Sequence, residues 1–382
     1  MRAPVRIEEV AGRRDLLDFV RFPWRVYRGD KNWVPPLIPE RLDRLNPESN
    51  PFFDHADVRL LRARSGRETL GTMAVFVDHL RLQHFQDGMG GFGFFEVVED
   101  FEVARALLDA GRERLLAWGM AGVIGPTNFG INDEPGVLLE GADAPAALLE
   151  AHSPPYYAPF LERYGMVKRF DNFAWRVDLG KLESILARLP EQFHRVLAAA
   201  EGRPEVRIRK LRMGDWEQEA ALTLRLYNAA HVTSPEHVPM PKEVFDRFAR
   251  QLRPLLDPDL VRFAEVDGEP VGYLVAIPDF NTVLLHLNGR LLPVGWLKAL
   301  WYRRRIDRVS FKLLGVLPRY RRQGIDLLLY FDAVREAARK GYCWLDGSLT
   351  ADHNPVVWRL AERMGAERYK HYRIYQMRFA AD

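Results

Sequence analysis

The residues best suited to chemistry lie in residues 314–326, where a basic, glycine-containing turn joins an apolar run to a long amphipathic pattern. Val316 ends the apolar run, and Pro318 prevents further strand pairing because it lacks an amide donor. A helix that begins just after Gly324 presents unpaired amide groups and the positive end of its dipole, which suit a pyrophosphate. Gly324 also permits close backbone approach to a ligand. The turn predicts a phosphate site, and added positive charge comes from Arg319, Arg321 and Arg322.

This stretch resembles the coenzyme A-binding loop of GNAT acyltransferases, which carry V-x-P-x-x-R/Q-x-x-G-x-G/A between their fourth strand and third helix. Val316, Pro318, Arg321 and Gly324 match that spacing. The resemblance implies an acyl-CoA co-substrate, acetyl-CoA or another, whose pantetheine pairs with the backbone of Leu314 and Val316. It also implies a pyrophosphate cradle formed by Arg321, Arg322, Gln323, Gly324, Ile325 and Asp326.

The motif departs from the family at two positions. Asp326 stands where the family has glycine or alanine, and Ala361 stands where a tyrosine general acid is common. Asn354, at the predicted start of the last helix, matches a common family asparagine, and we include it in the coenzyme site. Tyr369 and Tyr372, on the predicted last strand, are the candidates for the missing acid, although aromatic residues are also ordinary strand formers.

The chain repeats a pattern of elements at an offset of about 200 residues. Residues 55–78 and 257–279 each predict a hairpin with a turn glycine, and residues 161–165 and 361–365 each end a helix at a glycine. We therefore predict two tandem GNAT-like domains, residues 1–180 and 181–382. The predicted class is α+β, with a mixed, mostly antiparallel sheet flanked by helices in each domain.

Each half also contains a predicted strand, helix and strand in succession. These occupy 92–97, 104–119 and 121–126 in the first half, and 309–317, 324–341 and 342–346 in the second. Such units form parallel crossovers, so each sheet should combine parallel and antiparallel pairs. The first half has acidic residues at 98–102 where the second has its basic turn, which predicts that the first half binds no coenzyme A.

The first half offers candidates for an acceptor site instead. A polar, glycine-rich segment at 125–136 follows a predicted strand, where functional loops are common. A surface loop held by its own side-chain hydrogen bonds explains the same residues equally well. Glu96 ends a strand where some GNAT enzymes keep a general base, although a structural ion pair is the commoner role of such a residue. The substrate candidates are Asn128, Asn132, Asp133 and Glu134, together with Asn288 from an insertion in the second half.

Composition limits the other functions. The chain has 382 residues, 47% hydrophobic residues and a net charge of +3, which indicates a folded protein and argues against nucleic acid as a partner. One cysteine excludes an internal disulfide and fits a cytoplasmic location. The longest apolar run, 291–302, is too short to span a bilayer and contains Lys298, so we expect no membrane partner. No ligand pattern for a metal is present.

We predict an acyl-CoA-dependent acyltransferase that transfers an acetyl group to a small-molecule or peptide amine by direct attack on the thioester. Two alternatives stay open: a non-catalytic acyl-CoA-binding sensor, which the departures at Asp326 and Ala361 favour, and an aminoacyl transferase of the tandem GNAT type. The acceptor and the oligomeric state are not determined by the sequence.

Overall fold

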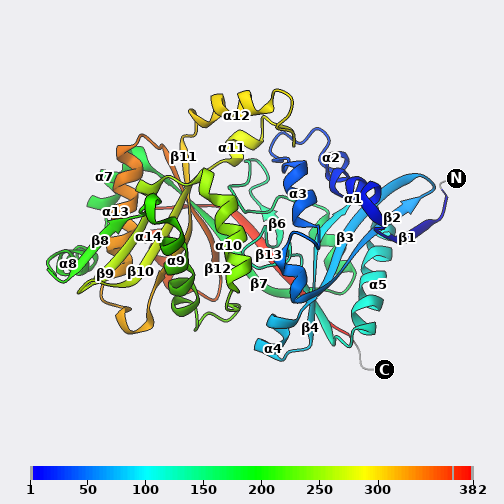
Figure 1. The fold of residues 1–382 in the computed structure, drawn as a ribbon, viewed down its shortest axis with the longest axis horizontal. Helices are drawn as coiled ribbons and strands as arrows, with labels where there is room; N and C mark the ends of the chain where they lie inside the picture. The colour runs from blue at the N-terminus through cyan, green and yellow to red at the C-terminus, as the bar shows by residue number, and fades with distance from the viewer. Residues whose placement is uncertain (1–2, 364, 380–382) are drawn as a thin grey trace.

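A computed structural model describes residues 3–363 and 365–379 of the chain. Its strands form one mixed sheet that runs through the whole molecule, with helices on both faces (Figure 1). The strand order is β1-β2-β3-β4-β5-β13-β7-β12-β11-β10-β9-β8, and β6 pairs with β13 off this path. The strands are β1 (Val5–Glu9), β2 (Ala56–Ser65), β3 (Glu68–Asp78), β4 (Met89–Val97), β5 (Gly122–Gly125), β6 (Val137–Glu140), β7 (Val167–Asp178), β8 (Val206–Lys210), β9 (Val261–Val266), β10 (Glu269–Pro278), β11 (Arg308–Val316), β12 (Trp344–Ala351) and β13 (Glu367–Arg378).

Fourteen α-helices connect these strands in the described part of the chain. They are α1 (Gly12–Arg21), α2 (Pro23–Val26), α3 (Ile38–Arg44), α4 (His79–Phe85), α5 (Phe101–Ala117), α6 (Tyr157–Arg163), α7 (Leu182–Ala187), α8 (Glu191–Glu201), α9 (Trp216–Ala230), α10 (Lys242–Leu252), α11 (Asn281–Leu284), α12 (Gly295–Arg303), α13 (Ile325–Arg339) and α14 (Pro355–Arg363). Among the described residues, no helix is both long and apolar enough to cross a membrane.

The two halves repeat one arrangement, which confirms the predicted tandem fold. In each half an antiparallel hairpin, β2–β3 or β9–β10, is followed by a parallel pair, β4–β5 or β11–β12. The helix of the crossover, α5 or α13, packs its apolar side on one face of the sheet. The opposite face is covered by α1 and α3 in the first half and by α9 and α10 in the second.

The last strands of the halves are exchanged. β7, which ends the first half of the chain, pairs with β12 of the second half, and β13 pairs with β5 of the first. β7 and β13 also pair with each other along most of their length. Each half therefore needs a strand from the other to complete its sheet, and the functional site can draw residues from both. The predicted domain boundary at residue 180 therefore stays a prediction, because one continuous sheet contains strands from both sides of that residue.

Candidate active site at the diverging strands

The parallel strands β11 and β12 separate after a short shared stretch. They pair only over residues 308–310 and 344–346. Beyond that point β11 stays with β10 as far as Val316, whereas β12 follows β7. The facing edges of the two strands are then no longer bonded to each other. A peptide-like ligand can enter such a gap and pair with the free strand edge.

Lys312 lies at the base of this gap, at an irregular position of β11. Val275 and Ala276 of β10 oppose Leu313 and Phe311, so Lys312 is the extra residue of a β-bulge. The ammonium of Lys312 lies 3.3 Å from a carboxylate oxygen of Glu150, 3.4 Å from one of Asp346, and 3.2 Å from the hydroxyl of Ser348.

Segments from both halves complete this group, which we call the buried cluster (Ser310, Lys312, Asp346, Ser348, Glu150, Tyr369 and Tyr372). The hydroxyl of Tyr369 donates to Asp346 at 3.1 Å, and that of Tyr372 donates to Glu150 at 3.4 Å. Ser310 donates to Asp346 as well. Glu150 comes from a first-half loop, which is held in place because the amide of Leu148 donates to Asp279 at 3.1 Å. The structure thus brings both tyrosine candidates into one site.

The electrostatics of the cluster follow from its burial. Burial, aided by the charge of Asp346, raises the pKa of Glu150 to about 8, and burial raises that of Asp279 to about 6. Burial alone would lower the pKa of Lys312, but the nearby carboxylates more than offset it and hold the ammonium protonated. Burial lowers the pKa of Lys370, whose ammonium donates to two backbone carbonyls, to about 8. Groups that exchange protons near neutral pH are typical of catalytic sites.

The predicted coenzyme turn follows β11 directly. Arg322 has φ 61° and Gly324 φ 77°, and α13 begins at Ile325. The guanidinium of Arg321 is bound to the carbonyl oxygen of Ala230 and lies 3.0 Å from the hydroxyl of Thr233. It therefore fixes the turn against the end of α9. The side chains of Arg322 and Asp326 are exposed, Ile325 is buried, and Leu314 is 39% exposed beside the gap.

Other parts of this turn are occupied by protein contacts. Gln323 accepts from Arg203 at 2.9 Å. A Cβ atom on Gly324 would lie 3.0 Å from Ala200 and 3.2 Å from the carbonyl oxygen of Val196, so the nearest approach to this glycine comes from α8. A side chain at position 324 would strain the backbone and displace α8. A loss of coenzyme binding after such a substitution could therefore not be assigned to a blocked ligand site. Asn354 is exposed just before α14, and its backbone amide donates to the carbonyl oxygen of Ala351.

The corresponding gap in the first half is filled. β4 and β5 pair only over residues 89–91 and 122–124. Beyond them, the amide of Thr127 donates to Phe92 at 2.8 Å, and the side chain of Asn128 accepts from the amide of Phe94 at 2.7 Å. A Cβ atom on Gly93 would lie 1.8 Å from the carbonyl oxygen of Thr127. The protein's own loop thus occupies the place where pantetheine would have to pair.

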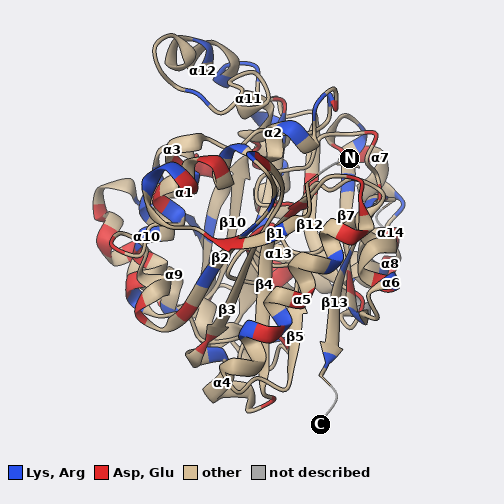
Figure 2. Ribbon diagram, turned by 90° about the vertical axis from the view of Figure 1, so that its right-hand side faces the viewer, with Lys and Arg blue, Asp and Glu red and all other residues tan. Residues whose placement is uncertain are grey.

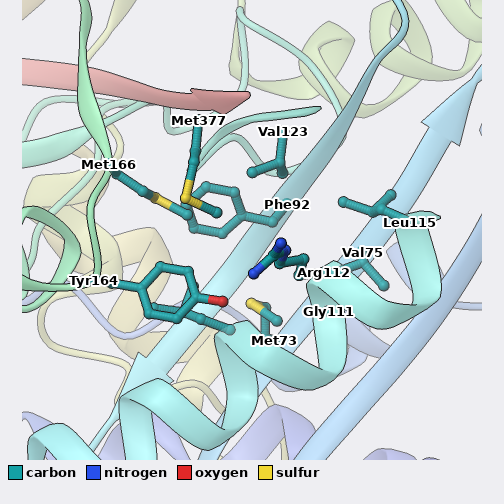
Figure 3. Close-up of a pocket in the computed structure, with 11 residues that line it drawn as sticks. Met73, Val75, Phe92, Gly111, Arg112, Leu115, Val123, Tyr164, Met166 and Met377 are labelled. Carbon is teal, nitrogen blue, oxygen red and sulfur yellow. The ribbon is translucent and has the colours of Figure 1, made fainter. Parts of the chain in front are cut away.

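The space beneath α5 is also closed. The cavity between α5 and the sheet of the first half has a volume of about 10 Å³, which admits about one water molecule. Methionine side chains converge on it, with Arg112 and Tyr164 at its side (Figure 3). An acyl chain does not fit there. The first half therefore shows a filled gap between β4 and β5 and a small cavity beneath α5, and its lack of coenzyme A binding stays a prediction.

The predicted acceptor residues of the first half are gathered, but their partners are protein groups. Glu134 forms an ion pair with Arg41 and accepts a hydrogen bond from the side-chain amide of Asn128. Asp133 forms an ion pair with Arg44. The side chain of Asn132 reaches into the second half and donates to the hydroxyl of Tyr227 at 2.7 Å. Asn288 accepts from the indole of Trp24 at 2.6 Å, which fastens the second-half insertion to the first half. An acceptor would have to displace these contacts.

Glu96 occupies a separate, enclosed place. It accepts from the hydroxyls of Tyr157 at 2.7 Å and Tyr27 at 3.4 Å rather than forming an ion pair. Burial raises its pKa to about 8. The two tyrosines come from α6 and from the residue after α2, so this carboxyl ties two helices to the end of β4.

Sequence reasoning missed Lys312, Asp346 and Glu150. Lys312 and Asp346 carried a readable signal, since each is a charged residue in an otherwise apolar strand segment, VSFKLLGV and YCWLD. A buried charge requires partners, so a charged residue on a predicted core strand indicates a site. Glu150 gave less warning, because its loop has no regular pattern.

Comparison with known proteins agrees with this structure. The bacterial ceramide synthase of Caulobacter vibrioides is 33% identical over 372 residues, which cover 95% of this chain and 94% of the relative. Protein YghO of Escherichia coli is 31% identical over 374 residues, which cover 95% and 93%. No protein-family model matches.

Solved structures share the fold at low identity. A tandem GNAT protein from the clavulanic acid biosynthesis pathway matches with a TM-score of 0.58 and 12% identity, over 99% of this chain and all of the other. A GCN5-related N-acetyltransferase from Sphaerobacter thermophilus matches with a TM-score of 0.52 and 13% identity, over 100% and 98%. The chain therefore belongs to the family of the Caulobacter ceramide synthase and YghO, and it is an acyltransferase with the tandem form of the GNAT fold.

Proposed function

We propose that the chain transfers an acyl group from an acyl-CoA to the amino group of an amphiphilic amine at the base of the gap between β11 and β12. The observation that carries the proposal is the buried cluster, which places Lys312, Asp346 and Glu150 where the two strands separate. The exposed edge of β11 near Leu314 would pair with pantetheine. The turn around Arg322 would hold the pyrophosphate, and Asn354 would border the site.

The reaction is a direct displacement. The amine nitrogen attacks the thioester carbon, the C–N bond forms, and the C–S bond breaks. The ammonium of Lys312 stabilises the negative charge that develops on the carbonyl oxygen, since a fixed charge in a water-poor site is effective there. The leaving thiolate takes a proton from the hydroxyl of Tyr369, which Asp346 orients.

The proton of the attacking amine passes along three groups in contact. Ser348 lies 3.2 Å from Lys312, and Lys312 lies 3.3 Å from Glu150. Lys312 gives a proton to Glu150 and recovers one from Ser348, which takes it from the amine. Because the pKa of Glu150 is about 8, its carboxyl can hold that proton near neutral pH. Glu150 is enclosed and receives the proton through Lys312. The hydroxyl of Tyr372 donates to Glu150 and holds that carboxyl in place, so Tyr372 is a positioning residue.

The acceptor class rests on the relative. A ceramide is an N-acylated long-chain amino alcohol, so the name of the Caulobacter protein implies amide formation on an amphiphilic amine. This favours a long-chain amine and a longer acyl donor over the acetyl transfer expected from the sequence.

The test is an assay of coenzyme A release and amide formation. Purified protein is supplied with acetyl-, octanoyl- or palmitoyl-CoA and with a long-chain amino alcohol, its short-chain analogue or a peptide amine, and products are identified by mass spectrometry. We expect release that depends on the long-chain amine and an amide of matching mass. Tight acyl-CoA binding with no release with any amine would favour the sensor alternative. No binding of any acyl-CoA would refute the proposal.

A further inference from the structure

The insertion after β10 exposes a large apolar surface. Six of the twelve exposed large hydrophobic side chains in the described residues fall between residues 292 and 301. Soluble proteins seldom gather so many in one place unless the place is a binding surface. We call this set the α12 face: Leu292 (77% exposed), Val294 (56%), Trp296 (48%), Leu297 (52%), Leu300 (55%) and Trp301 (49%).

The helix itself separates an inner from an outer side. Gly295 packs so closely that a Cβ atom there would lie 2.1 Å from the carbonyl oxygen of Arg290. Tyr302 stacks on His286 at 3.7 Å between ring centroids. These contacts fix one side of α12 to the body of the insertion. The exposed apolar residues therefore point outward from a helix that is packed in place, and they are not part of an unstructured loop.

The charge of the segment has one sign. Residues 280–306 contain no aspartate or glutamate and five basic residues, whereas acidic residues are spread through the rest of the chain. Figures 1 and 2 show α12 projecting from the body of the molecule, and blue segments mark the basic residues beside it in Figure 2. The basic residues are Arg290, Lys298, Arg303, Arg304 and Arg305.

We propose that the α12 face is a membrane-surface anchor that lies in the headgroup region of a bilayer containing anionic lipids. Tryptophan and leucine on one side of a helix, flanked by lysine and arginine, suit the interface between acyl chains and headgroups. Five cations without an acid complement an anionic lipid surface. The helix is too short to span a bilayer and lies along its surface instead. This proposal replaces the expectation that no membrane takes part, and it does not depend on the proposed reaction.

The location of the anchor suits a lipid-facing site. β10 ends at Pro278. The next residue, Asp279, accepts a hydrogen bond from the amide of Leu148 and so holds the loop that carries Glu150. Asn281, at the start of α11, donates to the carbonyl oxygen of Ala146 in the same loop. The anchor and the buried cluster are thus joined by a short, hydrogen-bonded stretch of chain.

The test is sedimentation of the full chain with anionic vesicles made from a mixture of phosphatidylcholine and phosphatidylglycerol. We compare the parent with Leu297→Ser/Leu300→Ser. A matched control, Leu116→Ser/Val167→Ser, changes two side chains of similar exposure, 44% and 58%, elsewhere. We expect the first variant to bind about tenfold or more weakly and the control within about twofold of the parent.

A second pair of variants tests the charges. Lys298→Gln/Arg304→Gln should weaken binding to the anionic vesicles by about tenfold or more, and Arg13→Gln/Arg14→Gln on α1 should not. Failure of the parent to sediment with anionic vesicles would overturn the proposal, and so would undiminished binding by the leucine variant. A parent dimer in solution that this variant converts to a monomer would assign the face to a second copy of the chain and also overturn it.

Discussion

Replacing Lys312 with methionine tests the electrostatics of the buried cluster. The change keeps the volume and removes the cation that lies 3.3 Å from Glu150 and 3.4 Å from Asp346. Both carboxylates then stay buried without that partner. Breaking a buried ion pair from one side costs about 3–5 kcal/mol, which corresponds to a melting temperature lower by about 4–6 °C for a chain of this size.

The loss should depend on pH in a definite direction. The folded pKa of Glu150, about 8, lies above its ordinary value of 4.5, so the folded protein holds a proton that the unfolded chain has released. Stability from this group is therefore full below about pH 4.5 and falls as pH rises through about 8. Without Lys312 the folded pKa rises further, and the deficit of the variant widens between pH 6 and pH 9.

The assay is thermal unfolding at pH 6 and pH 9 of the parent, Lys312→Met, Glu150→Gln and the double variant. Glutamine at 150 removes the charge that the methionine exposes, so the double variant should recover more than half of the loss at pH 9. An equal loss at both pH values, or no recovery in the double variant, would refute the reasoning.

Three further outcomes are expected elsewhere in the molecule. Glu96→Gln should stabilise the protein by about 2–4 kcal/mol at pH 9 and leave it unchanged at pH 5 in urea titrations, because burial raises the pKa of Glu96 to about 8 with tyrosine hydroxyls as its direct partners. Asn128→Ala should cost about 1–3 kcal/mol in the same titrations, since the part-buried backbone amide of Phe94 loses its acceptor. Acyl-CoA affinity measured by calorimetry should not change. Arg322→Glu should weaken acyl-CoA binding by about tenfold or more in calorimetry and leave the melting temperature unchanged. The control Arg13→Glu should leave acyl-CoA binding unchanged. Equal effects of the two substitutions would show that the turn is not part of the coenzyme site.

Much of the fold was predictable because its signals are local. The turn glycines Gly66 and Gly268 and the helix-ending Gly165 and Gly365 mark equivalent elements, and all four have positive φ. The strand exchange was not predictable. β7 and β13 are both aromatic-rich strands that follow a glycine-capped helix. Neither strand has a local sequence feature that indicates which half of the sheet it joins. That choice is made by pairing between residues far apart in sequence.

The site was predictable in part for a similar reason. The motif around Val316 and Gly324 locates the end of β11, and Tyr369 and Tyr372 follow from their place on the last strand. Asn128 illustrates the limit, since a polar loop residue that could bind a ligand accepts a backbone hydrogen bond in the first-half gap. The sequence shows which side chains can form hydrogen bonds, but it does not show which donor or acceptor will lie next to each of them in the fold. Glu150 enters the cluster only through the tertiary contact at Asp279.

The central claim is that acyl transfer occurs at the buried cluster with Glu150 as the final proton acceptor. The most direct test is the pH dependence of kcat/KM for Glu150→Gln and Glu96→Gln, two buried glutamates whose pKa values are both about 8. We predict that Glu150→Gln lowers kcat/KM by about a hundredfold or more and abolishes the rise of the parent profile near pH 8. Glu96→Gln should keep both the rate and the profile. Loss of activity and of the inflection in Glu96→Gln, with Glu150→Gln unaffected, would contradict the account.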